Sequence, residues 1–168
     1  PVADSGRIVI FGIPPDHPAT SFGYIKPGEA LNARIAMNVD EFVEKPDVSR
    51  AAELVSDGWL WNGGIFLMRA ATALSELGRH VPVIATAART AVTQGTGEGN
   101  ALMLAREPFL SAPAMSFDHA VMEHTDVGAV VAARFDLSDL GTWESVYAVD
   151  AKDANGNSKN QRLGKTQF

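Results

Sequence analysis

Short apolar runs in the first half of the chain are typical of buried strands. Residues 7–13 form a β-branched and aromatic run that ends at Pro14, which predicts a buried strand followed by a loop. Residues 33–44 alternate loosely between apolar and polar positions, and residues 59–68 are the most apolar stretch. Asn62-Gly63-Gly64 interrupts that stretch, which predicts a bulge or a backbone that something approaches closely.

Longer amphipathic stretches, most of them in the second half, predict helices. Ser49 is the expected N-cap and Gly58 the expected C-cap of the earliest of these helices, and Thr142 is the expected N-cap of the latest. The predicted helices cover residues 50–56, 70–79, 82–94, 101–110, 116–124 and 143–149. A further strand is predicted at 127–132, residues 20–25 fit strand or loop, and residues 95–99 and 137–141 are expected to be loops.

The order of these elements predicts an α/β protein. Strands and helices are interleaved, which favours helices layered on a sheet. The early strands are separated by connections too short for crossover helices, so part of the sheet is expected to be antiparallel.

Composition narrows the class of protein. The 168 residues suit one domain, and the net charge of −6 argues against nucleic acid or an anionic membrane as partner, because both need a basic surface. The chain has no cysteine, which excludes disulfides, thiolate metal sites and cysteine nucleophiles. The apolar runs are too short to span a bilayer and no signal-peptide pattern opens the chain, so a cytoplasmic protein is expected.

Two strand segments carry polar groups that could serve a ligand. Glu44 and Lys45 stand side by side at a strand end, where adjacent residues point to opposite faces unless the strand bends. A solvated strand terminus is the plainer interpretation of that pair. Asn62 is an amide inside an apolar strand, and it needs hydrogen-bond partners from the backbone or from a ligand.

Two further segments carry carboxylates. Asp118, His119 and Glu123 have a spacing that fits metal ligands, although a capped, partly exposed helix is the plainer interpretation of this segment. Asp136 and Asp139 lie in a loop after a strand, where active-site groups of α/β proteins gather, and a carboxylate there suits Mg²⁺. A P-loop, a dinucleotide-binding glycine motif and a serine-hydrolase elbow are all absent from the sequence.

In order and combination, these segments resemble the mannose-1-phosphate guanylyltransferases, a family of sugar-1-phosphate nucleotidyltransferases. The resemblance covers about residues 8–157 and includes F-V-E-K-P and a W-N-G-G-I-F element. The matching segments are Gly12-Ile13-Pro14, Pro18 to Ile25, Phe42 to Pro46, Trp61 to Phe66, Phe117 to Glu123 and Ser138 to Trp143.

The resemblance implies a fold and a reaction. The fold is a mixed, mostly parallel sheet flanked by helices, a Rossmann-like nucleotide-diphospho-sugar transferase fold. The reaction transfers GMP from GTP to mannose 1-phosphate, giving GDP-mannose and pyrophosphate, with Mg²⁺ as cofactor. Asp139 matches the metal-binding aspartate of the family, and Lys45 and Asp139 are the implied catalytic residues. Catalysis of this kind rests on positioning and on neutralising phosphate charge.

The resemblance also implies which residues bind the sugar phosphate. Glu44 and Asn62 match positions that hold sugar hydroxyls, and Lys45 matches a lysine that contacts the phosphate. Gly23 matches a glycine whose backbone faces the sugar, where a Cβ is unwelcome. Asp118 is a further implied substrate-binding residue.

The chain departs from the family pattern in ways that leave alternatives open. The family's N-terminal, triphosphate-binding half has no counterpart here, so residues 1–150 are expected to form an incomplete domain, inactive alone, with a raw sheet edge. Residues 151–168 are expected to be an unstructured polar tail. Substitutions such as Ser21-Phe22 leave another hexose 1-phosphate open as substrate. A non-catalytic sugar-phosphate-binding module is the second alternative, and a homodimer also stays open.

Overall fold

The computed structural model describes residues 2–31, 36–99, 101–133, 140–141 and 143–158. It divides into two compact units, residues 1–134 and residues 135–168. No helix among the described residues is long and apolar enough to cross a membrane. The functional assignment of residues 1–150 and 151–168 stays a prediction.

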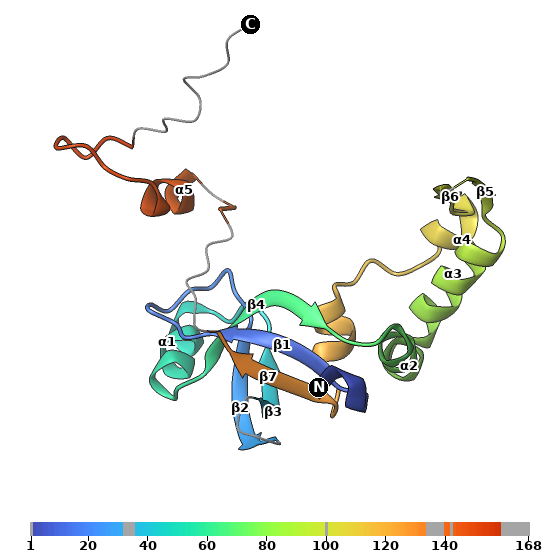
Figure 1. Cartoon of the computed structure of the whole chain (residues 1–168), viewed down its shortest axis with the longest axis horizontal. Coiled ribbons are helices and arrows are strands. Elements are labelled where there is room, and N and C mark those ends of the chain that lie inside the picture. Colours follow the sequence, from blue (N-terminus) through green and yellow to red (C-terminus); the bar gives the residue numbers. More distant parts are fainter. Residues whose placement is uncertain (1, 32–35, 100, 134–139, 142, 159–168) are drawn as a thin grey trace, which may run out of the picture. The chain divides into compact units, whose positions relative to one another are not determined.

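Five strands of the first unit close into a barrel in the order β1-β4-β2-β3-β7 (Figure 1). The strands are β1 (Ile8–Ile13), β2 (Tyr24–Ala30), β3 (Met37–Val43), β4 (Leu60–Leu67) and β7 (Gly128–Ala132). Strand β1 pairs with β7 in parallel, and the barrel's other four pairings are antiparallel. The short connection between β2 and β3 favours their antiparallel pairing, since a parallel pair needs a crossover of a dozen or more residues.

This topology corrects two expectations. The sheet is mixed, as expected, but it is not mostly parallel among the described strands. The expected raw edge is also wrong for the five-stranded sheet, because the described pairings return from β7 to β1 and leave no unpaired barrel strand.

Helices and a small hairpin fill the segment between β4 and β7. They are α2 (Ala70–His80), α3 (Pro82–Thr93), β5 (Thr96–Glu98), β6 (Ala101–Met103), α4 (Arg106–Leu110) and the π-helix η3 (Asp118–Met122). The predictions at α2, α3 and β7 are confirmed to within a few residues. The predicted helix over 101–110 is confirmed at 106–110, where α4 lies, and wrong at 101–103. The predicted loop over 95–99 is wrong at 96–98, because residues 96–98 and 101–103 pair as the β5–β6 hairpin with Gly99 at φ 60°.

Three more elements complete the described structure. They are the 3₁₀ helix η1 (Val2–Ser5), α1 (Val48–Ser56) and α5 (Trp143–Val149). The N-cap of α1 is Asp47 and not Ser49, because the Asp47 carboxylate accepts a hydrogen bond from the Arg50 N–H at 2.8 Å. Gly58 follows α1 at φ 79°, as a helix-ending glycine does.

The core lies among β1, β2, β3, β7 and the π-helix. Its buried members are Ile8, Ile10, Ile25, Phe42, Ala120, Val121, Met122 and Val130. Glu76 of α2 is buried, and its Oε2 accepts a hydrogen bond from the Thr125 hydroxyl at 2.5 Å. This bond fixes α2 to the turn after the π-helix, whose residues 120–122 belong to the core.

Candidate functional site

Glu44 and Lys45 follow the last residue of β3, and a sharp turn of the backbone brings their side chains together. Lys45 has φ 45°, in the left-handed region that non-glycine residues rarely adopt. The Lys45 Nζ lies 2.8 Å from Glu44 Oε1, although the side chain of Glu44 is 7% exposed and that of Lys45 is 63% exposed. The expectation that adjacent residues point apart fails here because the strand has ended and the chain bends.

Neighbouring carboxylates stabilise the protonated form of Lys45. The hydrogen bond to Glu44 and the negative charge of Glu44 raise the pKa of the Lys45 ammonium above its ordinary value, and Asp118 adds a smaller effect in the same direction. Lys45 is therefore a cation over the whole neutral range, with its Nζ paired to Glu44 and its side chain largely exposed to solvent. A phosphate group is a fitting ligand for such a side chain.

Asn62 joins β4 to the π-helix. Its Nδ2 donates to Asp118 Oδ1 at 3.0 Å, and its Oδ1 accepts from the Gly64 N–H at 2.9 Å. The register between β1 and β4 shifts beside this residue, which confirms the predicted bulge at Asn62-Gly63-Gly64. The Asn62 amide thus has partners on both sides and a fixed orientation.

Gly23 lies against both of these groups. Its carbonyl accepts from the Asn62 N–H at 2.7 Å. A Cβ built on Gly23 would lie 2.5 Å from Glu44 Oε2 and 3.3 Å from Asn62 Cβ. The carboxylate of Glu44 takes the space that a side chain would need, which explains a glycine at this position; contact between Gly23 and a sugar stays a prediction.

Gly23, Glu44, Lys45, Asn62 and Asp118, named here the polar cluster, therefore gather in the structure as the sequence suggested. The cluster holds an unsatisfied acceptor: Glu44 Oε2 is buried and has no hydrogen-bond partner among the described residues. A buried carboxylate oxygen without a donor is costly, by about 1–3 kcal/mol or more for a charged group. A ligand hydroxyl would supply the missing donor.

Sequence reasoning gave no role to Tyr24, which is fully buried and whose hydroxyl bonds twice to Ala19. Trp61 appeared only as part of a motif, and its buried Nε1 also has no partner among the described residues. The signal for both was a cluster of aromatic residues around the predicted loop. Burial and hydrogen bonding could not be read from that signal.

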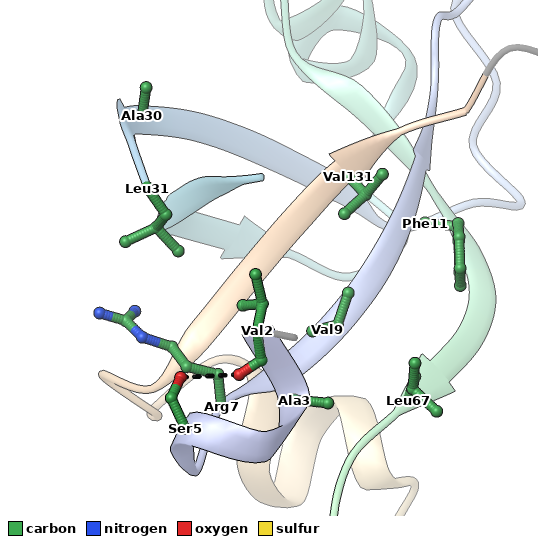
Figure 2. Close-up of a pocket in the computed structure, with 10 residues that line it drawn as sticks. All are labelled: Val2, Ala3, Ser5, Arg7, Val9, Phe11, Ala30, Leu31, Leu67 and Val131. Atoms are coloured by element: carbon green, nitrogen blue, oxygen red, sulfur yellow. Dashed lines mark hydrogen bonds between the residues drawn. The ribbon is translucent and has the colours of Figure 1, made fainter. Parts of the chain in front are cut away.

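An apolar hollow of the described structure lies elsewhere. This apolar groove, of about 760 Å³, contains no member of the polar cluster. Its lining residues are Val2, Ala3, Ser5, Arg7, Val9, Phe11, Ala30, Leu31, Leu67 and Val131 (Figure 2). Arg7 already donates to Asn38 Oδ1 at 2.8 Å and to the Gly128 carbonyl at 3.3 Å, so its donors are partly engaged within the fold.

The expected metal site is not described by the structure. Asp136 and Asp139 fall outside the described residues, and so does Thr142. Within the described ranges there is no group of three or more acidic or histidine side chains that could hold a metal ion. His119 Nδ1 lies 3.2 Å from Glu123 Oε2 on an exposed face, which fits the plainer interpretation of that segment.

The comparisons with known proteins define the class. The chain belongs to the nucleotidyl transferase family, which it matches over residues 2–156. It is 42% identical over 156 residues to a mannose-1-phosphate guanylyltransferase of Sinorhizobium fredii and 39% identical over 161 residues to that of Escherichia coli. These matches cover 92% and 94% of this chain but 30% and 34% of the relatives, so the chain spans about a third of their length. The family resemblance is confirmed.

Two solved structures share the fold. A Thermus thermophilus protein described as a mannose-1-phosphate geranyltransferase superposes with a TM-score of 0.76 and 31% identity, over 90% of this chain and 42% of its own. A Helicobacter pylori protein described as a mannose-6-phosphate isomerase gives a TM-score of 0.71 and 29% identity, over 82% and 54% respectively. Both support an α/β nucleotide-sugar transferase fold.

Proposed function

We propose that this chain supplies the sugar 1-phosphate site of an enzyme that transfers GMP from GTP to mannose 1-phosphate. The observation that carries the proposal is the buried Glu44 Oε2 beside Gly23 and Asn62, which has no hydrogen-bond partner in the part of the chain that the structure describes. A sugar ring offers hydroxyl donors for that oxygen, and the phosphate on its C1 offers an anion for Lys45. The names of the relatives favour mannose among the hexoses.

The described residues have distinct parts in this proposal. Glu44 accepts a sugar hydroxyl, and Asn62 and Asp118 keep the rim of the site rigid through their mutual hydrogen bond. Lys45 draws the phosphate to the mouth of the site and offsets its charge, so that a phosphate oxygen can attack the α-phosphorus of a nucleotide. The bond from that phosphorus to the departing pyrophosphate breaks as the new P–O bond forms.

The proposal includes Mg²⁺ on the basis of the sequence alone. Asp139 would bind it, by resemblance to the family, and Asp139 lies outside the described residues. The metal would neutralise phosphate charge when bound.

The direct test is isothermal titration of the 168-residue chain with mannose 1-phosphate, beside Glu44→Gln and the distant Leu67→Ser variant. Binding that is lost in Glu44→Gln and kept in Leu67→Ser is the expected result. Equal binding by all three chains would contradict the site.

A second hexose 1-phosphate is the alternative that a specific observation favours. Phe22 stands where the resembled pattern has a tyrosine, and its ring lies 5.0 Å from that of Trp61, beside the loop that ends at Gly23. Titration with glucose 1-phosphate distinguishes the two sugars: tighter binding of glucose 1-phosphate than of mannose 1-phosphate would favour the alternative.

A further inference from the structure

Residues 14–23 form the loop between β1 and β2 and contain no helix or strand. Two sets of side-chain contacts nevertheless fix this loop to the rest of the fold. The Tyr24 hydroxyl donates to the Ala19 carbonyl at 2.9 Å and accepts from the Ala19 N–H at 3.0 Å. Both polar groups of one loop residue are thereby satisfied by one fully buried side chain. The two hydrogen bonds join Ala19 to Tyr24 and so fix the conformation of the second half of the loop, which ends at Gly23.

The second contact is aromatic. The Trp61 ring lies 5.0 Å from the rings of His17 and Phe22, edge-on to the first and tilted to the second. Trp61 is itself buried and pairs across the sheet with Tyr24 and Ile13. Residues on both sides of Ala19 are thus packed on the strand that carries Asn62.

The loop matters because of where it ends. Gly23 lies so close to Glu44 Oε2, which lacks a hydrogen-bond partner among the described residues, that there is no room for a Cβ, and the Gly23 carbonyl accepts from the Asn62 N–H at 2.7 Å. A small displacement of Gly23 would therefore change the space in which Glu44 meets a ligand. Lys45 pairs instead with the other carboxylate oxygen of Glu44, at 2.8 Å.

We infer that Tyr24 is a positioning residue that sets sugar specificity, by holding Gly23 over Glu44 through its double hydrogen bond to Ala19. This inference rests on the proposed function, and it assigns to the loop the discrimination between hexose 1-phosphates that differ at one hydroxyl. It predicts that loss of the Tyr24 hydroxyl impairs the sugar contact and spares the phosphate contact.

The chain offers a matched control. It contains two tyrosines, and the hydroxyl of Tyr147 likewise donates to a backbone carbonyl, that of Gly156, at 2.7 Å. Tyr147 belongs to the other compact unit. Tyr24→Phe and Tyr147→Phe therefore remove the same chemical group, and only the first removes it from the unit that contains Gly23.

The experiment titrates wild type, Tyr24→Phe and Tyr147→Phe with mannose 1-phosphate, glucose 1-phosphate and inorganic phosphate, after thermal melts show that each chain is folded. In Tyr24→Phe we expect mannose 1-phosphate affinity to fall about five- to tenfold, the size of one lost hydrogen-bonding group. The ratio of the two hexose phosphate affinities should move towards one, while phosphate affinity stays within about twofold of wild type. Tyr147→Phe should leave all three affinities unchanged.

A second variant and a second measurement test the same inference independently of Tyr24→Phe binding. Trp61→Phe weakens the aromatic contact and keeps Tyr24, so it should shift the affinity ratio in the same direction by less. Amide hydrogen exchange at Asn62 should speed up in Tyr24→Phe and not in Tyr147→Phe. An unchanged ratio in a folded Tyr24→Phe chain, or an equal loss for the sugar phosphates and phosphate, would overturn this inference alone. Failure of wild type to bind any hexose phosphate would overturn the proposed function, and the inference with it.

Discussion

The polar cluster and the apolar groove are two parts of the same barrel unit with opposite properties. The groove is roomy, with about 760 Å³ of space, and its cation Arg7 is already hydrogen bonded within the fold. The polar cluster is tightly filled, and its buried carboxylate oxygen has no partner among the described residues. Space for a ligand would direct attention to hollows such as the groove, and unsatisfied hydrogen bonding directs it to the cluster.

This contrast indicates that a buried polar atom without a hydrogen-bond partner is a better guide to a sugar site than the volume of a hollow. A sugar hydroxyl gains most where a buried acceptor waits for a donor, since such an acceptor costs free energy until it is paired. An apolar hollow gains free energy from the burial of any apolar surface and so discriminates little among sugars that differ in one hydroxyl.

Of the substitutions that test this contrast, Glu44→Gln should have the largest effect on ligand binding. Loss of the charged acceptor should lower mannose 1-phosphate affinity about 10- to 100-fold, the range for a charge-assisted hydrogen bond. The melting temperature of the Glu44→Gln variant should not fall, because the substitution removes a buried charged oxygen that lacks a partner among the described residues. Calorimetric titration and thermal melts measure both effects. A large drop in melting temperature would mean that Glu44 serves the fold and not a ligand.

Gly23→Ala should have the next largest effect. The new Cβ would stand 2.5 Å from Glu44 Oε2 and push the carboxylate aside, with a cost of about 1–3 kcal/mol in unfolding free energy. Mannose 1-phosphate affinity should fall about tenfold as the acceptor moves.

Gly78→Ala is the matched control for that substitution. Gly78 lies inside α2, and a Cβ there meets nothing within 4 Å, so alanine should stabilise the chain by about 0.5–1 kcal/mol and leave binding unchanged. Denaturant unfolding compares the two variants. Equal effects of both substitutions would remove the argument from close packing at Gly23.

Lys45 separates backbone strain from charge. Lys45→Ala and Lys45→Gly should both weaken mannose 1-phosphate binding, by about two- to fivefold, since an exposed cation contributes modestly. Glycine should be the more stable of the two by about 1 kcal/mol, because residue 45 has φ 45°. Urea unfolding of both variants measures the difference. Greater stability of the alanine variant would show that the left-handed turn is not kept.

The pH dependence of Lys45 is the next test. The pKa of Lys45 is raised above its ordinary 10.5, so its charge is present in the folded chain below that pH and is lost only as the pH rises through the higher folded value. The difference in phosphate affinity between wild type and Lys45→Met should therefore stay constant from about pH 7.5 to 9.5. Phosphorus NMR titration measures it. A difference that disappears within this window would contradict the ion pair with Glu44.

Leu67→Ser should have the smallest effect. Leu67 lines the apolar groove and is 55% exposed, so its loss should change unfolding free energy by less than about 0.5 kcal/mol. Mannose 1-phosphate affinity should stay within about twofold of wild type, because the groove shares no residue with the polar cluster. A tenfold loss on titration would place the sugar in the groove.

Much of this picture could be predicted from the sequence where local signals were strong. The apolar run of β1, the interrupted run of β4 and the periodic helices α2 and α3 all lie where the hydrophobic pattern indicated. The members of the polar cluster were also identified, since each stands in a distinctive short motif. Their predicted roles, and the metal ligand Asp139, stay predictions.

The remainder depended on contacts that no local pattern encodes. Residues 101–103 have helix-forming side chains, but pairing across the turn at Gly99 makes them a strand. The meeting of Glu44 with Lys45 depends on one left-handed residue after the strand. Closure of the barrel requires β3 to pair with β7, which are about ninety residues apart.

The most direct test of the central claim is a titration of the isotopically labelled chain with mannose 1-phosphate, followed by amide NMR shifts. We expect the largest shifts at the amides of Gly23, Lys45 and Asn62, and unchanged shifts at Val9 and Leu67 in the apolar groove. Largest shifts along the groove, with those of the polar cluster unchanged, would contradict a sugar phosphate site at the polar cluster.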